Sequence, residues 1–162
     1  MGLPDWIKQV DQTSFEYDGT IRETTFKDVR GLIIVRSLVG PDGLIELETL
    51  ETYRQGYGRA GHYHPYEKRK DVIWGAIAWR IASPQTKEET EWKVSKTGDK
   101  IVVPSNQASL FIGLEPYTIL QVPKYGQKYI EMPYQPYRDE VNRLMIDGTY
   151  REELLDQLLK LV

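Results

Sequence analysis

The sequence contains no cysteine among its 162 residues. This excludes disulfide bonds, thiolate metal sites and a cysteine nucleophile, and it fits a reducing compartment. The N-terminus lacks the apolar stretch of a secretory signal, and no run approaches the roughly 20 apolar residues of a membrane span. We therefore expect a cytoplasmic protein with no membrane partner.

An excess of positive charge is also absent. With 21 basic and 24 acidic residues the formal net charge is −3, so the composition does not indicate a nucleic-acid partner. The one dense basic cluster, at 68–70, is typical of a solvated turn. Hydrophobic residues make up 40% of the chain, which is enough to bury a core, and we expect a single domain over 1–162.

Phenylalanine is scarce, with three residues against eleven tyrosines and four tryptophans. Most aromatic rings therefore carry a polar group. Such rings are favoured in ligand pockets, where a surface must be apolar and hydrogen-bonding at once. They are also common in ordinary strands, so the composition leaves both interpretations open.

Short segments with strand character dominate the first 132 residues. The segment 71–83 is apolar on both faces and is interpreted as one strand buried on both sides. Turn residues recur about every 8 to 12 positions, which indicates an antiparallel sandwich or barrel. The predicted strands lie at 31–40, 44–55, 71–83, 90–96, 99–104, 108–115, 117–124 and 127–133.

The end of the chain has helical character. Thr149 followed by Glu152 forms a capping-box pattern that opens a helix. An apolar stripe at helical spacing follows it. This stripe consists of Leu154, Leu155, Leu158, Leu159 and Val162. We therefore expect a β-barrel over 20–133 and a helical appendage over 137–162.

Histidine is nearly absent, and its two residues, His62 and His64, lie two positions apart. On a strand, both side chains point to the same face, here toward the barrel interior. Two imidazoles can contact one ion, but catalytic zinc usually has three protein ligands. Three interpretations stay open: hydrogen-bonded barrel residues, a catalytic base with its neighbour, or part of a metal site.

The spacing around the histidines is similar to that of the cupin superfamily. The first cupin motif, G-x5-H-x-H-x3-E-x6-G, is matched by Gly56, His62, His64 and Gly75. The second, G-x5-P-x-G-x2-H-x3-N, is matched by Gly98 and Pro104. The resemblance covers roughly residues 28 to 132. It implies a mainly β fold, a cupin double-stranded β-helix or jelly-roll barrel, followed here by C-terminal α-helices.

The chain departs from both motifs at metal-ligand positions. Lys68 stands at the glutamate position and Ser109 at the histidine position of the second motif. Because metal-binding cupins use these residues together with the two histidines, the resemblance implies that no cofactor is needed. A mononuclear metal enzyme would have to use His62, His64 and Glu67, and it stays a further alternative.

A metal-free branch of the cupins matches better. The segments "DVRG" (28–31) and "RAGHYH" (59–64) resemble those of dTDP-4-keto-6-deoxysugar 3,5-epimerases and of related sugar 3,4-ketoisomerases. This resemblance implies that His62 is the general base and that His64 is its neighbour. Proton abstraction next to a ketone also needs a nearby positive charge, which Lys68, Lys70 or Arg59 could supply. The candidate catalytic set is His62, His64 and Lys68.

The resemblance also implies a small-molecule sugar or sugar nucleotide as ligand. Gln121 stands where the epimerases have their tyrosine acid, and Tyr125 or Tyr129 could substitute for that acid. The candidate substrate-binding residues are Arg54, Arg59, Lys70, Trp74, Gln121 and Tyr125. We expect a homodimer, because cupin barrels often pair through their sheets. The alternative from another class is a non-catalytic cupin that binds a small carbohydrate or metabolite.

Overall fold

The computed structural model describes residues 11–17, 21–41, 43–123 and 130–162. Two helices, α2 (Gln135–Ile146) and α3 (Gly148–Leu159), follow a series of strands. The strands are β1 (Asp11–Tyr17), β2 (Ile21–Asp28), β3 (Gly31–Gly40), β4 (Gly43–Arg54), β5 (Gly58–Ala60), β6 (His62–Tyr63), β7 (Lys68–Trp74), β8 (Ala76–Ala82), β9 (Lys93–Lys96), β10 (Lys100–Val103), β11 (Ala108–Gly113), β12 (Tyr117–Pro123) and β13 (Met132–Pro133). This confirms the predicted mainly β class with C-terminal helices.

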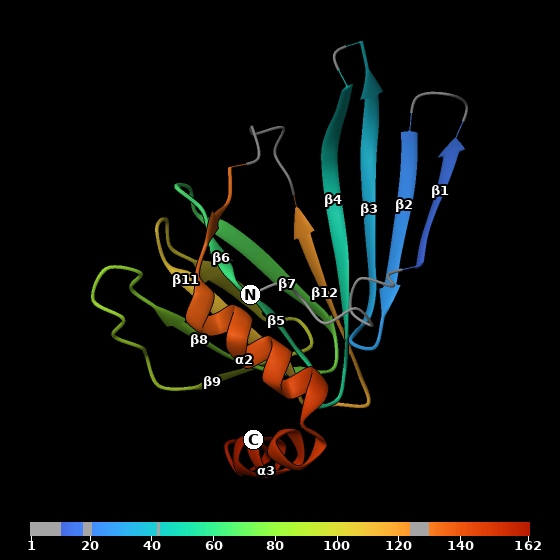
Figure 1. The fold of residues 1–162 in the computed structure, drawn as a ribbon. Helices are drawn as coiled ribbons and strands as arrows, with labels where there is room; N and C mark the ends of the chain where they lie inside the picture. Colours follow the sequence, from blue (N-terminus) through green and yellow to red (C-terminus); the bar gives the residue numbers. More distant parts are fainter. Residues whose placement is uncertain (1–10, 18–20, 42, 124–129) are drawn as a thin grey trace.

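Two antiparallel sheets form the body of the molecule (Figure 1). The larger has the order β1-β2-β3-β4-β12-β7-β10, and the smaller has the order β5-β11-β8-β9. A short pair of strands, β13 and β6, lies apart from both sheets in the pairing pattern. In Figure 1, the long strands β1 to β4 lie side by side on one side of the molecule, and α2 lies along the smaller sheet.

The core between the two sheets is built from alternate strand residues. On β8, Ile77 and Trp79 point inward, and Trp79 stacks on Phe111 of β11 with ring centroids 6.2 Å apart. Tyr53 from β4 and Leu120 from β12 complete the same cluster and are fully buried. Because this cluster fills one part of the space between the sheets, the remaining part is left for the polar cavity described below.

The opposite face of the smaller sheet packs against α2. Small residues of β8, such as Ala76 and Ala78, alternate with the inward side chains and allow the helix to come close. Val141 and Leu144 of α2 are buried against this face. The smaller sheet is therefore buried on both faces, which explains its nearly continuous apolar sequence.

The predicted single strand over 71–83 is wrong. The chain turns at Gly75, so that β7 joins the larger sheet and β8 joins the smaller one. Gly75 has a φ of +95°, which side-chain-bearing residues rarely adopt. A Cβ atom at this position would lie 2.7 Å from Oγ1 of Thr118. Because the residues on both sides of the turn are apolar, the hydrophobic pattern of the sequence does not reveal the turn.

Substituting Gly75 by alanine should lower the free energy of unfolding by about 1–3 kcal/mol, because the backbone is strained and the methyl group meets Thr118. Gly98→Ala is the matched control. Gly98 has a nearly identical φ of +94°, but a Cβ there meets no atom within 4 Å. Urea unfolding of both variants should show the larger loss for Gly75→Ala; equal losses would mean that the contact has no cost.

The C-terminal helix begins two residues earlier than the capping box at Thr149 predicts. Asp147 is its N-cap, and its carboxylate accepts a hydrogen bond from the backbone N–H of Tyr150 at 3.0 Å. Of the predicted apolar stripe, Leu158 is buried, whereas Leu159 and Val162 are exposed. Neither this helix nor α2, the helices of the described residues, is long and apolar enough to cross a membrane.

Candidate functional site

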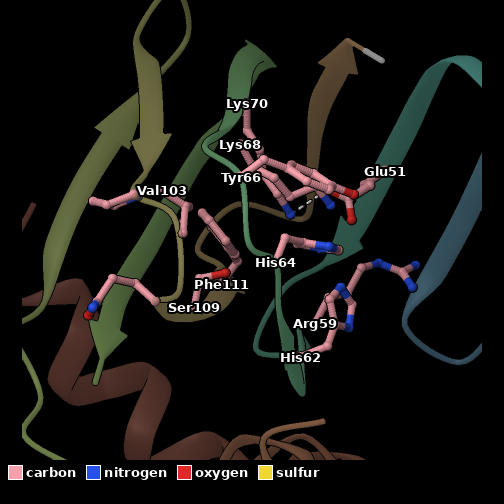
Figure 2. A pocket seen from close by; sticks show the side chains of 12 residues that line it. Glu51, Arg59, His62, His64, Tyr66, Lys68, Lys70, Val103, Ser109 and Phe111 are labelled. Atoms are coloured by element: carbon pink, nitrogen blue, oxygen red, sulfur yellow. Dashed lines mark hydrogen bonds and ion pairs between the residues drawn. The ribbon is translucent and has the colours of Figure 1, made fainter. Parts of the chain in front are cut away.

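A polar cavity of about 50 Å³ lies between the sheets, beside the apolar core (Figure 2). Its walls come from β4, β5, β6, β7 and β11, and from the loops that follow β6 and β10. The lining side chains are Glu51, Arg59, His62, His64, Tyr66, Lys68, Lys70, Val103, Pro104, Gln107, Ser109 and Phe111. Both histidines of the protein therefore meet in one cavity together with three cationic side chains.

The two histidine rings face each other edge to face. Their centroids are 5.0 Å apart, with an angle of 78° between the ring planes. Nδ1 of His64 donates a hydrogen bond to the backbone carbonyl of Ile130 at 2.6 Å, so Nε2 carries the lone pair of this ring. Tyr66 stacks on His64 at a centroid distance of 5.1 Å. His64 is thereby fixed in orientation, and 95% of its surface is buried.

His62 has a carboxylate beside it. Nδ1 of His62 lies 3.8 Å from Oε1 of Glu131, and Nη2 of Arg138 lies 3.6 Å from the same oxygen. Arg138 is anchored in turn, because its Nε donates to the carbonyl of Gly61 at 2.8 Å. The carboxylate favours the neutral tautomer with a proton on Nδ1, which leaves Nε2 as the proton-accepting atom of His62.

The surroundings hold His62 in its neutral form. Burial lowers the pKa of His62 to about 4, the nearby Glu131 opposes this shift, and Lys68 and Lys70 add to it. An ordinary histidine has a pKa of about 6.5. At neutral pH the ring can therefore accept a proton from a ligand.

The pKa of His62 is open to direct test by following both histidine rings in NMR during an acid titration. We expect a midpoint near 4 for His62. Lys68→Met should move the midpoint up, because it removes a cation, and Glu131→Gln should move it down, because it removes an anion. Lys160→Met, at the far end of α3, is the control. A midpoint near 6.5 in the wild type would contradict the burial argument.

The same shift links protonation of His62 to stability. Between pH 6.5 and 4 the unfolded chain binds a proton at this position that the folded chain does not. The contribution of His62 to the free energy of unfolding therefore decreases as the pH falls through this window. A glutamine at position 62 should remove this component of the pH dependence.

A buried ion pair closes one side of the cavity. Nζ of Lys70 donates to Oε1 of Glu51 at 2.8 Å and lies 4.2 Å from the ring centroid of Phe111 (Figure 2). Burial alone raises the pKa of Glu51, but the charge and hydrogen bond of Lys70 outweigh this effect and lower the pKa to about 2. Glu51 therefore stays ionised and holds the Lys70 ammonium in place.

The other two cations of the cavity are held differently. Arg59 is buried, and its Nη2 donates to the backbone carbonyl of Thr52 at 3.0 Å, so it acts as a fixed positive charge. Lys68 lies on β7 at the same strand phase as Lys70. The interpretation of 68–70 as a solvated turn is wrong, because alternation along β7 directs both lysines into the cavity and leaves Arg69 to pair with Asp71.

Several predicted substrate-binding residues lie outside the cavity. Trp74 is 63% exposed, because a register shift between β12 and β7 falls next to it and turns it out of the strand alternation. Gln121 lies on the opposite phase of β12 from the buried Leu120, and its amide donates to Glu48 at 2.7 Å. Arg54 is exposed at the end of β4. The structure does not bring these three residues to the histidines.

Two further candidates have different outcomes. Tyr125, like Tyr129, lies outside the described residues. Glu67 is exposed and does not line the cavity. Of the catalytic and substrate-binding candidates from the sequence, the cavity thus contains His62, His64, Lys68, Lys70 and Arg59.

Among the ionisable residues of the site, sequence reasoning missed Glu51, Tyr66 and Glu131. Glu51 was predictable, because it shares the phase of Thr49 and Tyr53 on an alternating strand. Alternation therefore directs its side chain inward. Tyr66 follows the histidines at the same two-residue interval but is not in a strand. No sequence pattern indicates Glu131, because its place beside His62 results from the pairing of β13 with β6.

The donor set does not fit a metal ion. Within the described ranges, no group of three or more His, Asp and Glu side chains is arranged to hold one. The carboxylate of the cavity, Glu51, is bound to Lys70, and Lys68 brings a further positive charge. A cation near the two histidines would meet repulsion from both lysines.

No protein-family model matches the sequence, and no curated protein matches it significantly. Solved structures do match. The capsular polysaccharide assembling protein CapF from Staphylococcus aureus superposes with a TM-score of 0.51 at 17% identity, over 70% of this chain and 31% of that chain. Oxalate decarboxylase from Lactobacillus farciminis superposes with a TM-score of 0.53 at 13% identity, over 88% of this chain and 41% of that chain. This chain thus spans less than half the length of either protein.

These similarities define the class of fold, a cupin jelly-roll domain. A cupin fold is what the resemblance in sequence predicted. RmlC from Streptococcus suis in complex with dTDP-D-xylose is also among the structural neighbours, with a TM-score of 0.42 at 14% identity over 71% of each chain. Identities this low establish the fold and leave the activity to the residues of the cavity.

Proposed function

We propose that the protein is a metal-independent epimerase or isomerase of a keto-sugar, with a nucleotide-linked sugar as the expected form of the substrate. The observation that carries this proposal is the juxtaposition of a neutral, carboxylate-flanked His62 with the ammonium groups of Lys68 and Lys70 in one cavity. A base and a fixed positive charge are the two groups needed to remove a proton next to a ketone.

The reaction balances with residues of the cavity. Nε2 of His62 takes the proton from the carbon next to the carbonyl, and the electron pair of that C–H bond moves onto the carbonyl oxygen as an enolate. The lysine cations offset the negative charge of this oxygen. For inversion, the hydroxyl of Tyr66 would deliver a proton to the opposite face of the carbon and become a tyrosinate; the His62 imidazolium would then lose its proton to water and the tyrosinate would take one up from water, which resets both residues. Return of the proton from His62 would restore the original carbon. Glu131 stabilises the imidazolium that forms in between.

The size of the cavity sets how a substrate would lie. A volume of about 50 Å³ is well below the roughly 300–1,000 Å³ of typical ligand pockets. It accommodates the reacting carbons of a sugar rather than a complete nucleotide sugar. The proposal therefore places the nucleotide outside the cavity, with only the carbonyl end of the sugar next to His62.

Proton exchange in heavy water tests the proposal before the product is known. The protein is incubated with nucleotide-linked 4-keto-6-deoxysugars and with unlinked keto-sugars in D₂O, and the proton next to the carbonyl is followed by NMR. Protein-dependent loss of this signal supports the enzyme. Binding of a sugar without exchange would favour the non-catalytic cupin instead, and exchange that depends on added metal would overturn the metal-free mechanism.

A further inference from the structure

A second cavity, of about 340 Å³, lies between the two helices and the smaller sheet. It shares no lining residue with the histidine cavity. Arg80 of β8 and Leu110 of β11 are register partners on the helix-covered face, whereas their neighbours Trp79 and Phe111 point to the other face. The two cavities are therefore separated by the sheet itself. This volume falls within the range of small-molecule sites.

The polar groups of this second cavity are held rigidly before any ligand arrives. Nε of Arg80 lies 3.2 Å from Oε2 of Glu89, and its Nη2 donates to the backbone carbonyl of Thr90 at 2.9 Å. The hydroxyl of Tyr137 donates to Glu89 at 3.0 Å, and the hydroxyl of Tyr150 donates to Glu140. Each carboxylate is thus fixed in direction and keeps further lone pairs for a ligand.

Aromatic rings form much of the remaining wall. Tyr134 and Tyr137 meet edge to face at a centroid distance of 4.9 Å, and both are almost fully buried. Trp92, from the loop before β9, and Tyr150, from α3, line the cavity beside them. Rings with hydroxyl groups at their edges offer an apolar surface together with hydrogen-bond partners.

The charges around the cavity balance, which bears on the class of ligand. The guanidinium of Arg80 lies 4.8 Å from the ring centroid of Trp92, and that of Arg143 lies 3.6 Å from the ring centroid of Tyr150. Two protein cations thus already contact the aromatic rings and offset the two carboxylates, so a cationic ligand gains little. An anionic ligand would meet Glu89 and Glu140. A neutral ligand with many hydroxyl groups fits this wall best.

We propose that this second cavity is a binding site for a neutral carbohydrate of one or two sugar units. The hydroxyl groups of the sugar would hydrogen-bond to Glu140, Gln157 and the Arg80–Glu89 pair, and its C–H face would pack on the tyrosine rings. The site lies on the helix-covered face of the smaller sheet, so it is separate from the proposed reaction at His62 and does not depend on it.

Saturation-transfer NMR and calorimetry with D-glucose, D-galactose, N-acetyl-D-glucosamine and maltose at millimolar concentrations test this site. At least one of these sugars should bind the wild type. Glu140→Gln keeps the shape of the side chain and should weaken that binding about tenfold, because it removes a charged acceptor. Trp92→Phe tests the aromatic wall and should weaken binding as well. Ser109→Leu, which fills the histidine cavity, and Trp74→Phe, on the exposed surface, are the controls.

The outcomes separate this proposal from the first one. Weaker binding in Glu140→Gln and Trp92→Phe, with unchanged binding in both controls, supports the second cavity. Binding that is lost in Ser109→Leu and kept in Glu140→Gln would place the sugar in the histidine cavity and overturn the inference. Binding of none of the four sugars to a folded wild type would overturn it too, whatever the result of the proton-exchange assay.

Discussion

Replacing His62 by glutamine should lower the rate of proton exchange on a keto-sugar by about 10²–10⁴-fold, with little change in affinity. Glutamine is similar in size and keeps hydrogen-bonding capacity, but it cannot take up a proton at neutral pH. The C–H bond would then break without a base, while the cations that hold the carbonyl oxygen stay in place. Exchange is measured by NMR in D₂O, and affinity by calorimetry on the same preparation.

Two further variants test whether the loss of exchange is specific to His62. His64→Gln should cost less exchange than His62→Gln, because Nδ1 of His64 is already used in the hydrogen bond to Ile130, whereas His62 has the carboxylate of Glu131 beside it. Trp74→Phe lies outside the cavity and should leave exchange unchanged. If His62→Gln instead loses affinity and keeps its exchange rate per bound sugar, His62 is a binding residue and the general-base assignment is wrong.

The strands that the sequence predicted well are those whose two faces differ or whose ends carry turn residues. The predicted strand at 31–40 has the bounds of β3, and the segment at 117–124 differs from β12 by one residue. The segment 71–83 failed because both halves are apolar, so hydrophobic periodicity does not reveal the turn at Gly75. Only the positive φ of that glycine marks the point where the chain changes sheets.

The candidate site was predictable where it depends on local alternation. His62 and His64 share one phase, as do Lys68 and Lys70, and all four side chains line the cavity. Alternation fails at Trp74, where a register shift between two strands changes the direction of the side chain. Such shifts depend on pairing between distant segments and are not visible in one strand.

Contacts between distant segments account for the rest of the site. Glu131 lies beside His62 because Pro133 of β13 pairs with His62 in the short two-stranded sheet. The carboxylate partner of the base therefore lies 69 residues further along the chain, and no sequence motif indicates it. Gln121 stands where the resembled epimerases have their tyrosine acid, and among the described residues Tyr66 is the tyrosine that lines the cavity.

Replacing Lys70 by methionine should lower the free energy of unfolding by about 3–5 kcal/mol, as expected when one partner of a buried ion pair is removed. The side chains of Lys70 and Glu51 are only 9% and 14% exposed, so the carboxylate would be left largely out of water. Methionine keeps the length of the lysine stem and its packing on Phe111, which confines the change to the charge. Urea unfolding at neutral pH measures the loss.

A double variant and a change of pH separate the ion pair from a mere packing defect. In Lys70→Met, the charge and hydrogen bond that oppose burial most strongly are gone, so the pKa of Glu51 rises relative to the wild type, although Lys68 and Arg59 still lower it. The folded variant then takes up a proton at a higher pH than the folded wild type, so its deficit relative to the wild type should shrink as the pH falls. Lys70→Met combined with Glu51→Gln should recover much of the loss at neutral pH, because neither charge of the ion pair remains. If the double variant is as unstable as Lys70→Met, the deficit comes from packing around Phe111, and Glu51 contributes no unpaired charge.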